Sequence, residues 1–157
     1  KGILVTPPLQ LNEINLRDES DVVAMLEERK DIWLFLMVEP AACDDACKRR
    51  FWEVRQTRVA LGKYQSYIQR YWLVTEGKPD DVTRQWLKQE HPDIKLLYSQ
   101  QQEWQSLLAK SPQGIQSQKE ARFYLVDPRN FLMMYYRPED TYKDVIVDMK
   151  FLLKGVE

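Results

Sequence analysis

The run from Ile32 to Val38 restricts the fold more than any other part of the sequence, because its residues are nearly all apolar. Glu39-Pro40 follows and ends the run. A short, continuous apolar run of this kind is typical of a strand that is buried on both faces, as in the middle of a mixed sheet. No run in the chain reaches the roughly 18 apolar residues that a membrane-spanning helix needs. We therefore expect an inner strand here and a sheet built around it.

The segments that follow this strand alternate between helical and strand-like patterns. Further strands are predicted over residues 68–74, 94–98, 122–126 and 131–136, and helices over residues 43–61 (after an initial turn), 79–90, 101–108 and 141–153. Asp127 to Asn130 predicts a hairpin turn between the last two strands. Thr141 and Asp144 predict a capping box for the last helix. Its expected apolar stripe consists of Tyr142, Val145, Met149, Leu152 and Leu153.

The first 20 residues are expected to form an extended N-terminal segment that packs on the domain. Pro7-Pro8 favours extended backbone. Leu9, Leu11, Ile14 and Leu16 are spaced for a short strand or hairpin at the edge of the domain. Ser20-Asp21 then predicts the N-cap of a short helix through Leu26.

This order of elements predicts the fold class. Strands and helices alternate first, and a hairpin and a final helix close the chain, which implies an α/β protein with a mixed sheet covered by helices on both faces. Thioredoxin-like domains have this layout. We expect residues 1–157 to form one such domain, since a chain of this length can bury a sizeable core.

The charge balance excludes two classes of partner. Charged residues make up 30% of the chain, but the formal net charge is only −1. Neither a basic footprint for nucleic acid nor a polybasic patch for anionic lipid is expected from that balance. The triplet Lys48-Arg49-Arg50 is the only tight basic cluster, and it is interpreted as a solvated helix surface.

The two cysteines of the chain, Cys43 and Cys47, are the main candidates for chemistry. A bond between them closes only a small loop, so a redox or metal role is favoured over a structural one. They lie at a predicted helix start, where free N–H groups stabilise a thiolate, while Asp44 and Asp45 oppose it. Residues at positions i and i+4 of a helix have Cβ atoms about 5 to 6 Å apart, and a disulfide needs about 3.8 Å. Bonding therefore requires Cys43 to lie in the turn before the helix, whereas Cu(I) or zinc held by two thiolates tolerates the wider gap.

The chain resembles the Sco/SenC family of thioredoxin-like, copper-handling proteins that assist the assembly of cytochrome c oxidase. Members carry C-P-D-x-C after an apolar strand, and this chain has Cys43-Asp44-Asp45-Ala46-Cys47, with Asp44 in place of the proline. Members also carry Y-L-I-D-P-D-G, which corresponds to the segment from Tyr124 to Asn130. A looser match to V-D-P-E-R-D-T lies between Val74 and Asp81. The resemblance extends from about Ile32 to Leu153.

The chain departs from that family at the third copper ligand, a histidine that precedes the Y-L-I-D-P strand. Residues 117–122 contain no histidine, and Lys119 falls in or beside its place. The sole histidine, His91, is expected in solvent at a helix C-terminus. Three methionines are soft alternatives, although core packing explains them better: Met37, Met133 and Met134. A thioredoxin-type reductase would also have a proline facing the cysteines, and none occurs between Gly114 and Phe123.

The resemblance implies an accessory protein of cytochrome oxidase assembly outside the cytoplasmic membrane, in the periplasm of a bacterium, tethered by an N-terminal segment that precedes this sequence. Cys43 and Cys47 would act as a thiol–disulfide reductant or oxidant, with Cys43 attacking, or would carry Cu(I). Asp44, Asp45 and Lys119 would support the site. The expected partner is a protein with cysteines, such as an oxidase subunit or a copper chaperone. The alternative is a non-catalytic thioredoxin-fold module that binds proteins; a peroxide-reducing enzyme fits less well, because the loop before Cys43 lacks threonine.

Overall fold

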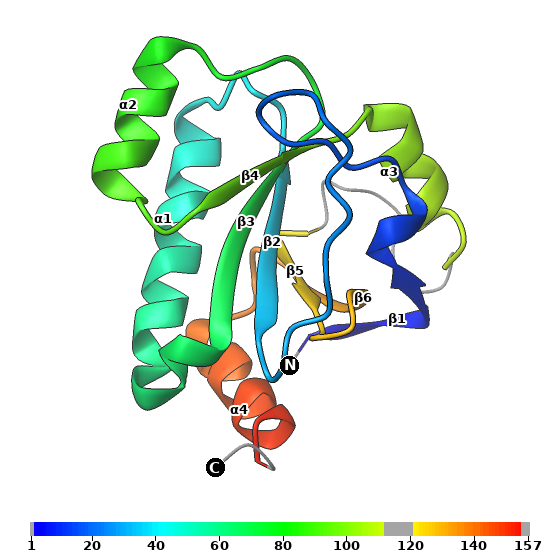
Figure 1. Cartoon of the computed structure of the whole chain (residues 1–157). Coiled ribbons are helices and arrows are strands. Elements are labelled where there is room, and N and C mark those ends of the chain that lie inside the picture. The colour runs from blue at the N-terminus through cyan, green and yellow to red at the C-terminus, as the bar shows by residue number, and fades with distance from the viewer. Residues whose placement is uncertain (1, 112–120, 155–157) are drawn as a thin grey trace.

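The computed structural model describes residues 2–111 and 121–154 (Figure 1). Within these residues six strands form one sheet in the order β1-β6-β5-β2-β3-β4. The strands are β1 (Ile3–Gln10), β2 (Trp33–Glu39), β3 (Ile68–Val74), β4 (Lys95–Tyr98), β5 (Phe123–Val126) and β6 (Phe131–Tyr136). The α-helices are α1 (Asp45–Ala60), α2 (Asp81–Glu90), α3 (Gln101–Leu108) and α4 (Tyr142–Leu152), and two 3-10 segments are η1 (Leu11–Glu13) and η2 (Gly62–Tyr67).

The sheet is mixed, as the order of elements predicted. Strand β2 pairs in parallel with β3, and β3 in parallel with β4. Such neighbours need crossover connections, which α1 and α2 supply. Strand β5 runs antiparallel to β2, and β6 and β1 continue the antiparallel half of the sheet.

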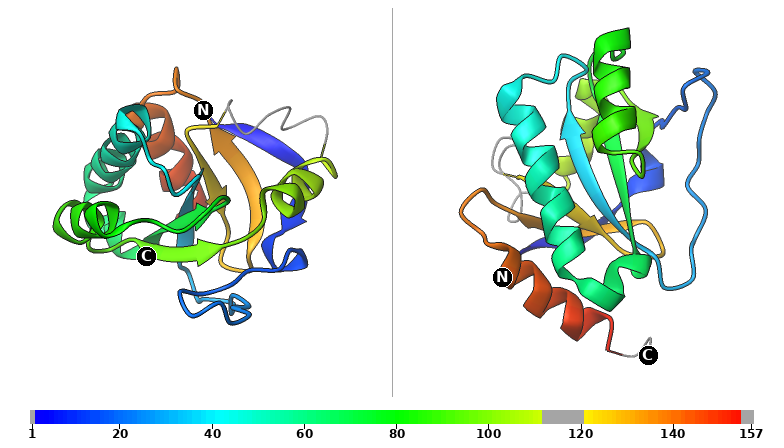
Figure 2. Two further views of the ribbon diagram at one scale, coloured as in Figure 1. Left: turned by 90° about the horizontal axis from the view of Figure 1, so that it is seen from above. Right: turned by 90° about the vertical axis from the view of Figure 1, so that its left-hand side faces the viewer.

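Helices cover both faces of the sheet. Figure 2 shows α1, α2 and α4 on one face and α3 on the other. The side chains of β2 alternate between the two cores: Phe35 and Met37 join the core under α1 and α4, while Leu34, Leu36 and Val38 join the core under α3. The predicted α/β, thioredoxin-like mixed sheet with helices on both faces is therefore confirmed.

The predicted elements agree closely with the observed ones. β3, β6 and α3 have the predicted bounds, and β2, β4, β5, α1, α2 and α4 differ by one or two residues at an end. The edge strand predicted around Leu9 to Leu16 lies earlier in the chain, at Ile3–Gln10. The capping box of Thr141 and Asp144 is present. One residue of the expected α4 stripe is misplaced: Tyr142 is half exposed, because the packed part of the stripe begins one turn later, at Val145.

The predicted helix from Ser20 to Leu26 is wrong. The Asp18 carboxylate accepts hydrogen bonds from the amides of Ser20 and Val22, and Asp21 has a positive φ of 62°. An acidic side chain that bonds to nearby backbone amides competes with helix formation. The segment instead folds back as a turn, in which Arg17 forms isolated bridges to Val23 and to Tyr98 at the end of β4.

The N-terminal segment contributes an edge strand. β1 pairs with β6 along the sheet, and the side chains of Leu9, Leu11 and Leu16 are buried against the core under α3. Among the described residues, no helix combines the length and the apolar character needed to cross a bilayer.

Candidate thiol site at the start of helix α1

The two cysteines lie where β2 gives way to α1, at the carboxyl end of an inner strand. After β2 ends at Glu39, the Ala41 amide donates to the carbonyl of Glu76 (2.8 Å), and the Cys43 amide donates to the carbonyl of Ala41 (2.8 Å). These bonds fix the turn that precedes the helix. Asp44 is the N-cap residue of α1, so Cys43 lies before the helix and Cys47 lies in its first turn.

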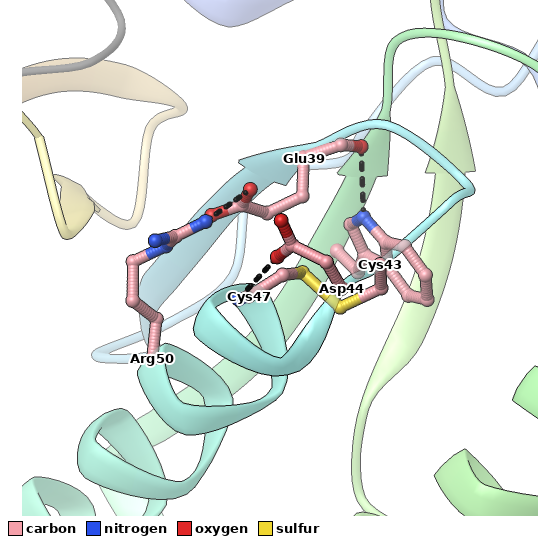
Figure 3. The surroundings of a disulfide bond; sticks show 6 residues. Glu39, Cys43, Asp44, Cys47 and Arg50 are labelled. Atoms are coloured by element: carbon pink, nitrogen blue, oxygen red, sulfur yellow. Dashed lines mark hydrogen bonds and ion pairs between the residues drawn. A yellow bond between two sulfur atoms is a disulfide. The ribbon is translucent and has the colours of Figure 1, made fainter.

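Cys43 and Cys47 are joined by a disulfide (Figure 3). Their Cα atoms lie 5.2 Å apart, within the usual range for a bonded pair. The position of Cys43 outside the helix agrees with the geometric condition that the sequence set. Both residues are buried and belong to the core under α1, with Cys43 8% exposed and Cys47 2% exposed.

The two aspartates between the cysteines lie at the start of α1. The Asp44 carboxylate accepts a hydrogen bond from the Cys47 amide (2.9 Å), which is the usual N-cap bond. Asp45 is the exposed first residue of α1, where a negative charge suits the positive end of the helix. Lys119, the other predicted supporting residue, lies outside the described residues.

A charged pair beside the disulfide was not foreseen from the sequence. Arg50 donates two hydrogen bonds to the Glu39 carboxylate, at 2.7 and 2.9 Å, and these bonds raise the pKa of Arg50. The indole N–H of buried Trp72 donates to the backbone carbonyl of Glu39 (3.0 Å). Figure 3 shows this arrangement next to the first turns of α1. It fixes the end of β2, and through it the turn that carries Cys43.

An open groove of about 610 Å³ borders the disulfide. Its walls are the turn from Pro40 to Asp44 and the loop that leads into α2, and its lining includes Cys43 but not Cys47. Gly77, at φ +69°, brings that loop close to the turn: a Cβ built on it would lie 3.5 Å from the Cβ of Ala41. A partner that enters the groove therefore meets Cys43 and not Cys47.

The other predicted metal ligands do not gather at the cysteines. Within residues 2–111 and 121–154, no three His, Cys, Asp or Glu side chains are grouped so as to hold a metal ion. Met37 and Met134 are buried in the core under α1, and Met133 is partly buried against it. These positions agree with the core-packing interpretation of the methionines.

The expectation that His91 lies in solvent is wrong. His91 is only 2% exposed, and its ring packs edge-on against Trp86 and Phe51. The Nδ1 atom lies 3.1 Å from Nη2 of Arg70, which is itself 1% exposed and makes two hydrogen bonds to Asp93 at 2.7 and 2.9 Å. Burial, followed by the positive charge of Arg70, lowers the pKa of His91 to about 4. The histidine is therefore neutral near pH 7 and is held in the core.

A family model described as "Transmembrane-like, thioredoxin-like, C-terminal domain" matches residues 33–155, which include β2, the cysteine pair and every later element. The chain belongs to this thioredoxin-like family. No curated protein sequence matches this family member.

Solved structures with the same fold include several Sco proteins. Copper-bound yeast Sco1 is 18% identical, with 90% of each chain covered and a TM-score of 0.63. A SCO1/SenC family lipoprotein from Bacillus anthracis is 16% identical, with 94% of this chain and 98% of that chain covered and a TM-score of 0.61. Apo Sco1 from Thermus thermophilus is 16% identical, with 97% and 96% covered and a TM-score of 0.60. At these identities the similarity establishes the fold, and it confirms the structural part of the resemblance to Sco/SenC proteins.

Proposed function

We propose that the chain is a thiol–disulfide protein of the Sco type that assists the assembly of a respiratory cytochrome oxidase. The observation that carries the proposal is the disulfide between Cys43 and Cys47 at the start of α1, with Cys43 bordering an open groove. A disulfide that closes so short a loop contributes little to holding distant parts of the fold together. Its place at a helix N-terminus suits a thiolate, since the free N–H groups there favour negative charge.

The exchange begins at Cys43. In the direction of reduction of this chain, a partner thiolate attacks the sulfur of Cys43, and the electron pair of the broken S–S bond leaves on Cys47. The second partner thiolate then attacks the partner's own sulfur in the mixed disulfide, which forms the partner disulfide and releases Cys43 as a thiolate. The products are the Cys43–Cys47 dithiol and an oxidised partner, with two electrons and two protons transferred. The reverse sequence, with Cys43 attacking a partner disulfide and Cys47 resolving, reduces the partner.

Copper is the proposed alternative cargo of the same pair. When reduced, Cys43 and Cys47 offer two thiolates, which are soft ligands that suit Cu(I). A histidine ligand is not at hand among the described residues, because His91 is occupied by Arg70. We therefore propose transfer of Cu(I) rather than a stable Cu(II) site. Copper-bound Sco structures of the same fold support this choice of cargo.

The proposed setting is the outer face of the cytoplasmic membrane, with an N-terminal tether. The description of the Bacillus anthracis relative as a SCO1/SenC family lipoprotein supports this setting. The proposed partner is a protein with cysteines, such as an oxidase subunit or a copper chaperone.

Single cysteine variants of the reduced protein test the order of attack. We expect Cys47→Ser to trap a mixed disulfide through Cys43 with a small disulfide such as 5,5′-dithiobis(2-nitrobenzoate), and Cys43→Ser to react far more slowly. The reason is that Cys47 is the more buried residue and does not line the groove. Faster trapping through Cys47 would reverse the proposed roles.

A second function is favoured by the burial of the pair. Both cysteines belong to the hydrophobic core, so the disulfide can be permanent and the domain can be a non-catalytic module that binds proteins through its surface. Thiol titration before and after treatment with a mild reductant, followed by titration with Cu(I), separates the two functions. Reversible appearance of two thiols, or binding of one Cu(I) per dithiol, supports the first function. If no thiols appear reversibly and no Cu(I) binds, the binding module is supported.

A further inference from the structure

The outward face of α4 carries an unusual stripe of side chains. Lys143, Val147, Lys150 and Phe151 recur at intervals of three and four residues along the helix, and Lys154 continues the row in the turn that follows. Residues at these intervals share one side of a helix. All five are exposed, with Val147 at 56% and Phe151 at 74%. We call these five residues the α4 stripe.

The α4 stripe contains three lysines and no acidic residue, and the two acidic residues of the helix, Asp144 and Asp148, make their hydrogen bonds to groups outside the stripe. Asp144 completes the capping box with Thr141. Asp148 accepts hydrogen bonds from the hydroxyl of Tyr136 (3.0 Å) and from the amide of Gly2 (2.8 Å). Within the described residues, none of the three lysines of the stripe makes an ion pair. Positive charge and apolar surface therefore remain available side by side on one helix.

We propose that the α4 stripe is a docking surface for an anionic lipid bilayer. Lysines that alternate with apolar side chains are typical of helices that lie in a membrane interface, where the lysines meet phosphate groups and the apolar side chains enter the interfacial region. Two apolar side chains are too few to form the buried centre of a stable protein–protein interface, which favours lipid over an acidic protein. The stripe departs from the expectation that the sequence has no lipid-binding patch. That expectation rested on overall charge, whereas the helix brings together lysines that are separated in the sequence.

The position of α4 gives the docking a definite orientation. The helix lies toward the end of the molecule opposite the start of α1, so the disulfide and its groove face away from a surface bound there (Figures 1 and 2). The hydrogen bond from Gly2 to Asp148 places the N-terminal end of the described chain on the flank of the same helix. A tether joined ahead of Gly2 would therefore emerge beside the docking surface. The lipid proposal itself rests on the α4 stripe and not on the redox function of the cysteines.

Partition into vesicles tests the proposal with the full chain. We expect binding to vesicles of phosphatidylcholine with about 30% phosphatidylserine at low salt, and little binding to phosphatidylcholine alone. Since the net charge of the chain is −1, overall attraction does not account for such binding. Raising the salt to about 0.5 M shortens the screening length to a few ångströms and should abolish most of the binding.

Variants of the stripe and of another face locate the contact. Neutralising Lys143, Lys150 and Lys154 to Gln should lower the partition coefficient on the order of 100-fold, given about a fivefold effect for each lysine. Phe151→Ser should lower it several-fold through lost apolar contact. The matched control neutralises three exposed lysines of other elements, Lys30, Lys88 and Lys95, and should leave binding within about twofold of the unchanged protein.

Three results would overturn the proposal. The first is absence of binding to the anionic vesicles at low salt. The second is equal binding to neutral and anionic vesicles. The third is an equal loss of binding in the control triple variant and the stripe triple variant. Thiol titration of the same variants keeps the two proposals apart, because changes on α4 should leave the reactivity of Cys43 and Cys47 unchanged.

Discussion

Two clusters of chemically capable side chains lie at opposite ends of the same parallel strands and differ in what their surroundings permit. Cys43 and Cys47 are neighbours in the sequence, and one of them opens on a groove. Arg70, His91 and Asp93 come from two segments and join in a network around a fully buried guanidinium. The first cluster can meet a partner molecule, while the second satisfies its own groups within the fold. Accessibility to a partner, and not residue type alone, therefore separates a candidate for chemistry from a structural element.

The largest expected effect on stability comes from replacing Arg70, the residue at the centre of the buried network. Arg70→Met should lower the free energy of unfolding by about 3 kcal/mol, because buried His91 and the partly exposed Asp93 carboxylate both lose their hydrogen-bond partner. Urea unfolding followed by tryptophan fluorescence measures the loss. Arg129→Met is the matched control: its guanidinium is exposed and lies 3.9 Å from Glu28, so the change should cost less than about 0.5 kcal/mol. A loss of less than about 1 kcal/mol for Arg70→Met would mean that the network is not structural.

The next effect concerns the protonation of His91. The folded pKa of about 4 lies below the usual value near 6.5, because burial and Arg70 disfavour the charged ring. As the pH falls from 6.5 to 4, the unfolded chain takes up this proton and the folded protein does not. Stability contributed by neutral His91 is therefore complete above pH 6.5 and falls by about 3 kcal/mol on acidification to pH 4.

The single histidine makes this pKa directly measurable, since its ring protons are the only imidazole signals in a proton NMR titration. We expect a midpoint near pH 4, and a His91→Asn variant should lack this part of the pH dependence of unfolding. A midpoint near 6.5 would show that the ring is solvated and would contradict the buried network.

The sequence predicted the first cluster and missed the second for a physical reason. Cys43 and Cys47 are set by local features, namely the end of an apolar strand and the start of a helix, and these are visible within a few residues. His91 meets Arg70 only because β3 and β4 pair in parallel and carry residues more than 20 positions apart to one place. The place of His91 at a helix C-terminus suggested solvent, but the packing of Trp86 and Phe51 against its ring overrides that local pattern.

The same distinction explains the other outcomes of the sequence analysis. The inner strands were predicted well, because continuous apolar runs such as Ile32 to Val38 have few alternatives in a folded protein. The Glu39–Arg50 pair was missed, since its partners lie 11 positions apart and meet only after α1 packs on β2. The helix predicted after Ser20 failed because a single carboxylate, that of Asp18, bonds to the backbone amides of the segment.

A third effect concerns the disulfide itself. Reduction of Cys43–Cys47 should lower the free energy of unfolding by about 2 kcal/mol, because the bond closes only a five-residue loop of the unfolded chain. Urea unfolding with and without reductant measures the difference. The Cys43→Ser, Cys47→Ser double variant should show the reduced stability under both conditions, and its His91 pKa should remain near 4, since the two clusters share no bond. A loss well above about 4 kcal/mol would instead indicate that the disulfide is a structural element like the buried network.

The smallest expected effect divides the two roles of Asp44, which caps α1 and places a negative charge beside the sulfurs. Asp44→Ala should cost about 1 kcal/mol of stability through the lost cap, whereas Asp44→Asn keeps an acceptor for the Cys47 amide and should cost little. Both changes remove the charge, so both should lower the thiolate pKa in the reduced protein and speed its reaction with iodoacetamide near pH 7. Thr141→Ala, which removes the cap of the distant helix α4, should match the stability loss of Asp44→Ala without altering the thiol reaction. If the thiols of all three variants react with iodoacetamide at the same rate as those of the unchanged protein, Asp44 serves the fold alone. The charged groups at the start of α1 would then be structural, like those of the buried network, and would differ from them only in their exposure.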